Sequence, residues 1–512
     1  MAMKRIITFI LALVGVVMLH ARIHVIQVKD KRYQTVTGFG AACCDGAMCP
    51  YGEDTQPVKL LYGPAIGLNI MRMEISPNFK GDITAADVGW DTPYDWNGSL
   101  PSAKIVKQRG GIVFGTPWSP PGEYKTNGVA NGGKVNDQDA NDPQNQRGAL
   151  RTDCYDKFFP WINTFLAYMK ENGVDVDAVS VQNEPDWWVN YSGCLYTYAQ
   201  QVTLVKNYAH LLDRETYKGV RLISAEPLGF DPGYSNALMN DPDAREQIDI
   251  IAGHLYGHPP LGNMKAAADV ASPYGKEVWM TEHSVNDQIT GRLPNWDEQL
   301  EFARELNECM LAGGTGYIYW YMRAHWSFIG TGEEKYGSDN VKNRLLPRAY
   351  VMSHFSKYVT GSTRLEISRS TFTTSTNSDL EASVYIKGDS IIVMAINSTN
   401  DDHSLRVSLP YYVKSGKHVI STGNLKSKLC QSQAIPFETS ATTATVDMPA
   451  KSLNTYIFMI DPEATAIVDL EQIEDDGPNT YYDLQGRRID KPQGLCIEKS
   501  ADGFSRKVYI KN

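Results

Sequence analysis

Residues 178–185 read Ala-Val-Ser-Val-Gln-Asn-Glu-Pro, a short apolar run that ends in polar residues. Seven comparable runs lie along the chain, and longer segments with helical periodicity separate them. This alternation is typical of βα units around a parallel sheet. The eight runs are Gly38–Cys44, Ile70–Ile75, Ile112–Trp118, Ala178–Pro185, Arg221–Phe230, Asp249–Gly257, Glu277–Ser284 and Gly314–Met322.

The number of runs predicts the fold class. Eight strands over about 300 residues indicate an α/β fold of the (β/α)8 TIM-barrel type, which we expect to cover residues 38–360. Within residues 296–311, apolar residues recur at helical spacing and form one apolar face, namely Phe302, Leu306 and either Cys309 or Met310. A doubly wound open sheet is the main alternative, but no glycine-rich phosphate motif follows the first run.

A period-two pattern without helices begins after Thr360 and predicts an antiparallel β-sandwich at residues 361–462. Apolar residues alternate over residues 382–386 and again over residues 391–395. Gly388-Asp389 lies between the two segments, so we expect a β-hairpin there.

The chain begins with a segment that resembles a secretory signal peptide. Lys4 and Arg5 precede an apolar run, and small residues end it near Ala21. A membrane anchor is the alternative, but the run of about 14 residues is shorter than the roughly 20 needed to cross a bilayer. We therefore expect residues 1–21 to be removed and the protein to be secreted, periplasmic or bound to a bacterial cell surface.

Three further segments complete the predicted organisation. Residues 22–37 are strand-like and could pair with the sandwich. A polar, acidic linker at residues 463–480 precedes a small β module at residues 481–512. The pattern from Tyr481 to Arg488 resembles the carboxy-terminal tails of secreted Bacteroidetes proteins, which act as sorting or anchoring signals. A degenerate remnant of such a tail is the alternative.

Composition and charge exclude several kinds of partner. Removing the predicted signal peptide takes the formal net charge from −10 to −12, which argues against nucleic acid and anionic membranes. No later segment predicts a transmembrane helix, and no motif predicts a metal or cofactor. We expect a monomer that acts on a neutral substrate. One or two disulfides could form among the cysteines, which are Cys43, Cys44, Cys49, Cys154, Cys194, Cys309, Cys430 and Cys496.

Two glutamates fall where a TIM barrel carries its active site, at the C-terminal ends of strands. Glu184 closes the fourth run and Glu282 closes the seventh, and these two strands lie across the barrel mouth from each other. Glycoside cleavage needs one carboxylic acid that protonates the leaving oxygen and one carboxylate that attacks the sugar or activates water. Either glutamate alone could be a surface residue, but the pair predicts an active site.

Six motifs in the same order resemble glycoside hydrolase family 30. The resemblance extends from about Val25 to Ile460, and Met352–Val359 adds a likeness to the xylanase branch. The motifs are Gly38–Gly40, Gly115–Pro121, Val181–Pro185, Asp249–Gly257, Trp279–Glu282 and Trp320–Arg323.

The resemblance implies roles for individual residues. Glu184 would be the acid/base and Glu282 the nucleophile of a retaining enzyme. Asn183 would hydrogen-bond the sugar 2-hydroxyl, and Tyr256 would orient the nucleophile. Arg72 would keep the nucleophile ionised through its positive charge, with a structural salt bridge as the alternative.

Aromatic residues near the strand ends are candidate sugar-binding residues, because sugar rings stack their C–H faces on aromatic rings. Some of them could belong to the core instead. His254 could pack in the barrel or hydrogen-bond the substrate or a catalytic group. The aromatic candidates are Trp118, Trp187, Trp188, Tyr191, Trp320 and Tyr321.

One departure from the family concerns the substrate. Glucuronoxylan-specific members carry two consecutive arginines after the eighth strand, whereas here Arg323 is followed by Ala324. Losing a guanidinium removes bidentate carboxylate recognition, so strict dependence on glucuronate is not expected. The sequence predicts an endo-1,4-β-xylanase that could be directed to glucuronoxylan or glucuronoarabinoxylan.

Other functions stay open. Residues 122–128 also resemble the glucanase and glucosylceramidase branches, so a β-1,6-glucanase, a glucosylceramidase-like enzyme or an exo-acting xylan enzyme is an alternative. A non-catalytic carbohydrate-binding surface protein is the alternative of another class.

Overall fold

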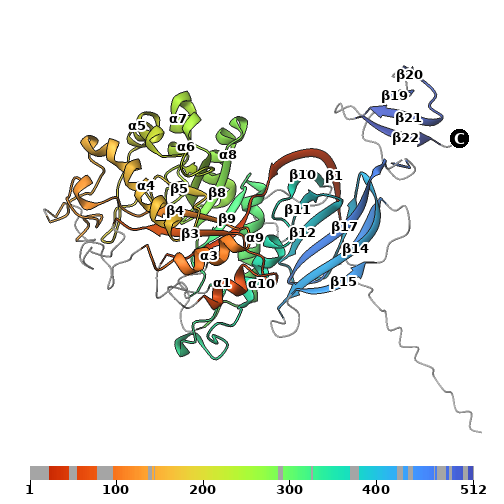
Figure 1. Cartoon of the computed structure of the whole chain (residues 1–512). Coiled ribbons are helices and arrows are strands. Elements are labelled where there is room, and N and C mark those ends of the chain that lie inside the picture. The colour runs from red at the N-terminus through yellow and green to blue at the C-terminus, as the bar shows by residue number, and fades with distance from the viewer. Residues whose placement is uncertain are drawn as a thin grey trace, which may run out of the picture.

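The computed structural model contains a closed barrel, a nine-stranded sheet and a separate five-stranded sheet (Figure 1). Among the residues it describes, no helix is long and apolar enough to cross a membrane. The predicted signal peptide and Ala324 lie outside the described residues. The structure describes residues 22–44, 55–77, 96–135, 141–142, 144–285, 292–323, 327–369, 380–423, 430–435, 442–465, 468–469, 480–483, 487–499 and 505–510.

Eight parallel strands pair in chain order, and the first pairs with the last to close the barrel. Each strand lies inside one of the eight predicted runs, so the predicted (β/α)8 barrel is confirmed. The strands are β2 (Gly38–Ala42), β3 (Ile70–Ile75), β4 (Ile112–Pro117), β5 (Ala178–Ser180), β6 (Arg221–Ile223), β7 (Ile250–His254), β8 (Glu277–Glu282) and β9 (Gly316–Tyr319).

Helices surround the barrel and cover the outer faces of its strands (Figure 1). The predicted apolar face of α9 is confirmed, since Phe302, Leu306 and Met310 are all fully buried. A capping box between Asn295 and Glu298 begins this helix. The helices are α1 (Gln56–Leu61), α3 (Leu100–Gln108), α4 (Tyr155–Glu171), α5 (Tyr198–Tyr208), α6 (Pro232–Asn240), α7 (Pro242–Gln247), α8 (Lys265–Ala271), α9 (Trp296–Leu311) and α10 (Pro347–Ser356).

An apolar layer fills the barrel interior at one end. Ile70, Phe114, Ala252 and Trp279 meet there with other strand residues, and all of them are buried. Strand side chains alternate between the two faces, so residues two positions further along the same strands also point inward. The barrel is therefore closed below, and polar side chains can gather only above this layer, at the C-terminal strand ends.

The nine-stranded sheet is mostly antiparallel and has a core of its own. The predicted hairpin is confirmed, because Ala382 lies opposite Ala395 and Ile386 lies opposite Ile391. The N-terminal strand pairs with β10 on one side and β13 on the other. Strands β12 and β16 are far apart in the strand order but are in contact, so the sheet folds over its core as a sandwich does. Its strands are β1 (Arg22–Thr35), β10 (Thr363–Arg369), β11 (Leu380–Lys387), β12 (Ser390–Asn397), β13 (His403–Ser408), β14 (Tyr411–Thr422), β15 (Gln431–Ile435), β16 (Thr443–Met448) and β17 (Ser452–Thr465).

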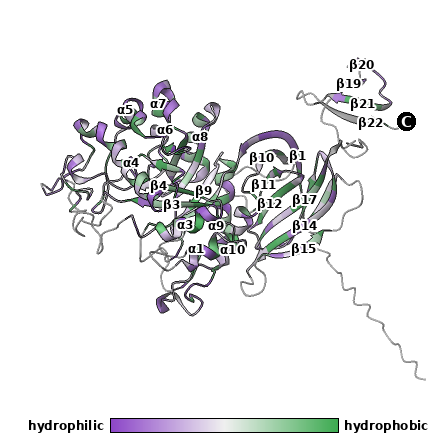
Figure 2. Cartoon of the chain, in the orientation of Figure 1, coloured by the Kyte–Doolittle hydropathy of each residue, from purple (hydrophilic) through white to green (hydrophobic). Residues whose placement is uncertain are grey.

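Polar bonds join this sheet to the barrel through α9 and α10. Arg304 lies 2.8 Å from Glu381, and Trp296 donates to the carbonyl of Lys451 at 2.7 Å. His354 lies between Thr455 and Ser421, 2.8 Å from each hydroxyl. Figure 2 shows apolar residues along the strands of both units and polar ones on outer helices such as α5 and α7. The sheet thus forms one packed body with the barrel.

The last part of the chain forms the five-stranded sheet. Strand β17 continues to Thr465, and the first strand of the small sheet lies within the predicted linker at residues 463–480. The strands of the small sheet are β18 (Val468–Asp469), β19 (Thr480–Tyr482), β20 (Arg488–Ile489), β21 (Gly494–Lys499) and β22 (Ser505–Ile510).

Among the described residues, every cysteine is a free thiol, so the disulfides that the sequence leaves open do not form there. The adjacent Cys43 and Cys44 illustrate the reason, because neighbouring residues of an extended segment face opposite sides. Cys43 packs in the core outside the barrel, whereas Cys44 packs against Trp118 inside it.

Candidate active site

Three strands each place a polar side chain in one layer above the apolar interior. Arg72 follows Ile70 by two positions, Thr116 follows Phe114, and His254 follows Ala252. All three polar side chains are fully buried. Since β-strand side chains repeat every second residue, the same alternation that closes the barrel below creates this polar layer.

Glu282 reaches the layer because β8 contains an irregularity. Gly253 pairs with Met280, but His254 pairs with Glu282, so the register shifts by one residue past Thr281. Such a bulge redirects a side chain and brings Glu282 opposite the inward-facing His254. There Arg72 donates to one carboxylate oxygen of Glu282 at 2.5 Å, and the Tyr256 hydroxyl donates to the other at 3.0 Å.

Glu184 lies just beyond β5 in a left-handed backbone conformation, with φ of 41°. Its backbone N–H donates to the carbonyl of Glu226 at 2.8 Å, and its own carbonyl accepts from Trp187 at 3.1 Å. Left-handed backbone costs a non-glycine residue of order 1–3 kcal/mol and is concentrated at functional sites. The turn places the carboxylate 3.0 Å from Nδ1 of His254.

The structure therefore brings Glu184 and Glu282 together. One oxygen of each carboxylate and a ring nitrogen of His254 all lie within 4.8 Å of one another. Both glutamates are more than nine-tenths buried. The neighbouring Asn183 accepts from Arg72 through its side-chain oxygen at 2.7 Å, which directs its NH₂ group away from the guanidinium.

A third buried carboxylate, Glu226, belongs to the same cluster and was not predicted. It follows β6, is fully buried, and lies 3.1 Å from Arg72 and 3.5 Å from Nε2 of His254. The Thr116 hydroxyl donates to its other oxygen at 2.8 Å. A signal was present in the sequence, because Glu226-Pro227 near the end of the fifth run matches Glu184-Pro185 at the end of the fourth.

Burial and neighbouring charges set the protonation of the cluster. Burial alone would raise the pKa of Glu226, but Arg72 and His254 lower this pKa to about 2. Burial alone would lower the pKa of His254, but Glu282, Glu184 and Glu226 raise it to about 9. Burial, followed by the nearby charge of Glu282, raises the pKa of Glu184.

These shifts describe a balanced charge arrangement. With Arg72 and His254 positive and Glu226 and Glu282 negative, the cluster is neutral when Glu184 carries a proton. A cationic His254 donates from Nδ1 to one oxygen of Glu184, so the proton of Glu184 is directed to its other oxygen. Burial also raises the pKa of the Tyr256 hydroxyl, with Glu282 adding to the effect, so this group remains a donor.

Glu184, His254 and Glu282 have the spacing of metal ligands, but the surrounding charge does not suit a metal. The guanidinium of Arg72 already binds Glu282, and His254 binds two carboxylates as a cation. A divalent ion would lie beside two positive groups, so the cluster fits acid/base chemistry better than metal binding.

Two tryptophans cover the cluster. The rings of Trp118 and Trp320 stack with centroids 5.8 Å apart, and the Arg72 guanidinium lies 4.6 Å from the first and 5.8 Å from the second. Tyr191 packs against the cluster that Trp118 forms with Ala42 and Cys44. Trp118 is only 5% exposed, so in this structure its ring is covered by its neighbours.

Of the remaining predicted residues, Tyr321 lies beside Trp320, whereas Trp187, Trp188 and Arg323 lie in the loops after β5 and β9. Tyr321 is 8% exposed and packs against Trp320. Trp187 is 48% exposed, whereas Trp188 is held by a hydrogen bond from its ring nitrogen to the Gly132 carbonyl at 3.0 Å. Arg323 follows β9, and its backbone pairs with that of Ile329 in an isolated β-bridge.

Comparisons with known proteins place these features among carbohydrate-active enzymes. No family profile matches the sequence. The glucuronoxylanase XynC of Bacillus subtilis (strain 168) is 27% identical over 349 residues, which are 65% of this chain and 68% of that protein. The lysosomal acid glucosylceramidase of Mus musculus is 24% identical over 439 residues, which are 74% of this chain and 78% of that protein.

A solved structure extends the likeness. The glycoside hydrolase family 30 subfamily 8 xylanase Xyn30A of Clostridium acetobutylicum has a TM-score of 0.65 and 29% identity. The match covers 85% of this chain and 99% of that one. Barrel and side sheet thus share their arrangement with a known xylanase.

Proposed function

We propose, from the premise that this chain is a glycoside hydrolase related to family 30 and its xylanase branch, that it cleaves β-1,4-xylan by retaining double displacement. One observation carries the proposal: the buried carboxylates of Glu184 and Glu282 approach within 4.8 Å of each other. Retaining enzymes hold their two carboxyl groups roughly 5–5.5 Å apart, whereas inverting enzymes leave 6.5–9.5 Å for a water molecule.

In the first step, Glu282 attacks the anomeric carbon through one oxygen. The bond from this carbon to the leaving oxygen breaks, and Glu184 transfers its proton to that oxygen. Arg72 and Tyr256 bind Glu282 at its two oxygens and so fix its direction of attack. Asn183 directs its NH₂ group away from Arg72 and can donate to the sugar 2-hydroxyl.

In the second step, Glu184 acts as the base. It removes a proton from water, the water oxygen attacks the anomeric carbon, and the bond to Glu282 breaks. Two inversions leave the configuration unchanged. His254 holds Glu184 in place during both steps through its Nδ1–H.

The proposed substrate rests on the relatives and on the site. Glucuronoxylanase XynC and the family 30 xylanase are the relatives that suggest xylan. Arg323 is the cation that we propose for any glucuronic acid side group. We also propose that residues 1–21 direct the chain out of the cytoplasm, that the mature protein is a monomer, and that Trp118, Trp320 and Trp187 contact sugar rings.

The substrate test compares glucuronoxylan, arabinoxylan, linear xylan and β-1,6-glucan as substrates for protein that lacks residues 1–21, with product masses as the readout. We expect xylan fragments and no requirement for a glucuronate group. If only the β-1,6-glucan is cut, the xylan proposal is wrong while the mechanism stands. That outcome is the second candidate, because the endo-1,6-β-D-glucanase neg1 of Aspergillus fumigatus is 26% identical over 308 residues.

The charge of Glu226 is expected to affect the pH dependence of kcat/KM. Glu226→Gln removes one negative charge beside His254 and Arg72. Loss of this charge lowers the pKa of the other titratable groups in the cluster. Activity requires a protonated Glu184 and falls as pH rises, so we expect the basic limb of kcat/KM to move to lower pH by about one unit.

A matched variant separates charge from structure. Thr116→Val removes a hydrogen bond to Glu226 and leaves its carboxylate charge, so the basic limb should stay close to its original position. Equal shifts in the two variants would show that packing around Glu226, rather than its charge, controls the limb.

A further inference from the structure

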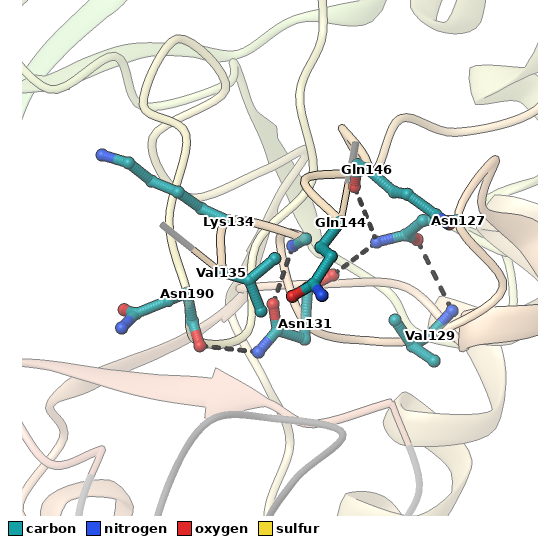
Figure 3. Close-up of a pocket in the computed structure, with 9 residues that line it drawn as sticks. Asn127, Val129, Asn131, Lys134, Val135, Gln144, Gln146 and Asn190 are labelled. Atoms are coloured by element: carbon teal, nitrogen blue, oxygen red, sulfur yellow. Dashed lines mark hydrogen bonds between the residues drawn. The ribbon is translucent and has the colours of Figure 1, made fainter. Parts of the chain in front are cut away.

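One concavity of the described structure lies outside the catalytic cluster. A pocket of about 530 Å³ opens between the loop after β4 and the loop after β5 (Figure 3). Asn190 in its lining follows Glu184 by six positions in the same loop. Both loops leave the C-terminal ends of barrel strands, so the pocket belongs to the catalytic face of the barrel.

We propose that this pocket is a distal subsite that binds uncharged sugar residues of the polysaccharide, away from the bond that is cleaved. The inference rests on the proposed function, because it assumes a long carbohydrate substrate. It adds a binding site that the catalytic cluster does not require.

The lining has the chemistry of a sugar site. An amide side chain both donates and accepts hydrogen bonds, as a sugar hydroxyl does. Val129 and Val135 are 37% and 65% exposed and offer apolar surface to C–H groups. The volume lies within the roughly 300–1,000 Å³ of small-molecule sites. The amides in the lining are Asn127, Asn131, Gln144, Gln146 and Asn190.

The described lining residues favour an uncharged ligand. None of them is acidic. Lys134 is the charged residue among them, and Figure 3 shows its side chain extending away from the amides. Its ammonium lies 5.9 Å from the Trp187 ring and 5.8 Å from the Trp188 ring, where it does not face a ligand in the pocket.

Hydrogen bonds fix part of the pocket lining before any ligand binds. Asn131 donates to the carbonyl of Asn190 at 2.6 Å and accepts from the Gly133 N–H at 2.7 Å. Gly133 has φ of 86°, and a Cβ there would lie 1.6 Å from the Gln146 carbonyl oxygen, so glycine is required. A site that needs little ordering loses less free energy on binding.

Lys125 joins the two loops that line the pocket. Its side chain is 2% exposed, and its ammonium donates to the carbonyls of Ala130, Asn131 and Gly193 at 2.8, 2.9 and 2.6 Å. Two of these carbonyls belong to the first loop and the third belongs to the second loop. This buried cation therefore holds the two loops together.

Two amides remain available to a ligand. Within the described part of the chain, the side chains of Gln144 and Asn190 have no hydrogen-bond partner. Gln144 points between Val135 and Val129 in Figure 3. Trp187 lies between Glu184 and Asn190 in sequence, and its half-exposed ring offers a sugar-stacking surface in the same loop as Asn190.

The test measures kcat/KM for oligosaccharides of increasing length, and for the polymer, with the full mature chain. The double variant Gln144→Ala/Asn190→Ala is compared with Gln108→Ala/Asn207→Ala, which removes the same two side-chain types from exposed helix positions. We expect the pocket variant to match the parent on the shortest substrate that is cleaved. It should lose about tenfold on the polymer, which corresponds to about 1.4 kcal/mol.

Binding supplies a second readout. In a Glu282→Gln background, calorimetry with the longest oligosaccharide should show the same tenfold weakening in the pocket variant alone. The inference is overturned if the pocket variant keeps full activity on the polymer, or if it loses activity equally at every length while its melting temperature equals that of the parent. If the parent cleaves no polysaccharide at all, the proposed function fails first and the subsite fails with it.

Discussion

Glu282→Gln is expected to lower kcat on xylan by at least about 10⁴-fold, or about 5 kcal/mol of transition-state stabilisation. An amide cannot form the covalent glycosyl intermediate, so the retaining route is lost rather than slowed. Steady-state rates on xylan, with mass spectrometry for a trapped glycosyl adduct on the parent enzyme, measure the effect.

The structure offers a matched control on the same strand. Glu277 lies at the opposite end of β8 and is bonded to Arg221 at 2.5 Å. Glu277→Gln also removes an acidic partner from an arginine, but it lies far from the polar layer, so kcat should change by less than about tenfold. Comparable losses in both variants would assign the effect to the strand and remove Glu282 from its role as nucleophile.

The fold was predictable because its signals are local and repeated. Eight apolar runs and the helices between them follow directly from hydrophobic periodicity, and each barrel strand lies within its run. The positions of Glu184 and Glu282 followed from the same rule, because they end their runs. The hairpin from β11 to β12 was equally local, since a Gly388-Asp389 turn sets its register.

The centre of the site was less predictable because it depends on contacts between distant strands. Glu226 follows β6, yet its role comes from Arg72 on β3 and His254 on β7. The irregularity near Thr281 that turns Glu282 inward is visible only in the pairing of β7 with β8. A sequence pattern gives the period of a strand but not the point at which its register shifts.

The burial of Trp118 has the same origin. Its position after β4 suggested an open sugar-stacking surface, but Arg72 and Trp320 lie against its ring. The rings that cover Arg72 remove it from water, and its two carboxylate partners offset this desolvation cost. The aromatic cover and the ion cluster combine residues of several strands, so neither can be read from one segment alone.

Glu184→Ala should separate the two roles of Glu184 by the choice of leaving group. On xylan, whose leaving hydroxyl needs a proton, we expect kcat/KM to fall about 10²- to 10⁴-fold. An aryl xyloside with an acidic phenol leaves without a proton, so kcat/KM for this substrate should fall much less. Because burial and Glu282 raise the pKa of Glu184, the parent loses activity as pH rises through that pKa, and the variant should lack this limb.

Azide tests the second step of the same variant. Glu184→Ala opens space next to Glu282, and azide needs no base, so it can attack the anomeric carbon while the bond to Glu282 breaks. The product expected is a β-glycosyl azide, because two inversions retain the configuration. An α-azide would mean direct displacement and an inverting enzyme. No rescue, combined with equal losses on both kinds of leaving group, would mean that Glu184 positions the cluster around His254 rather than transferring the proton.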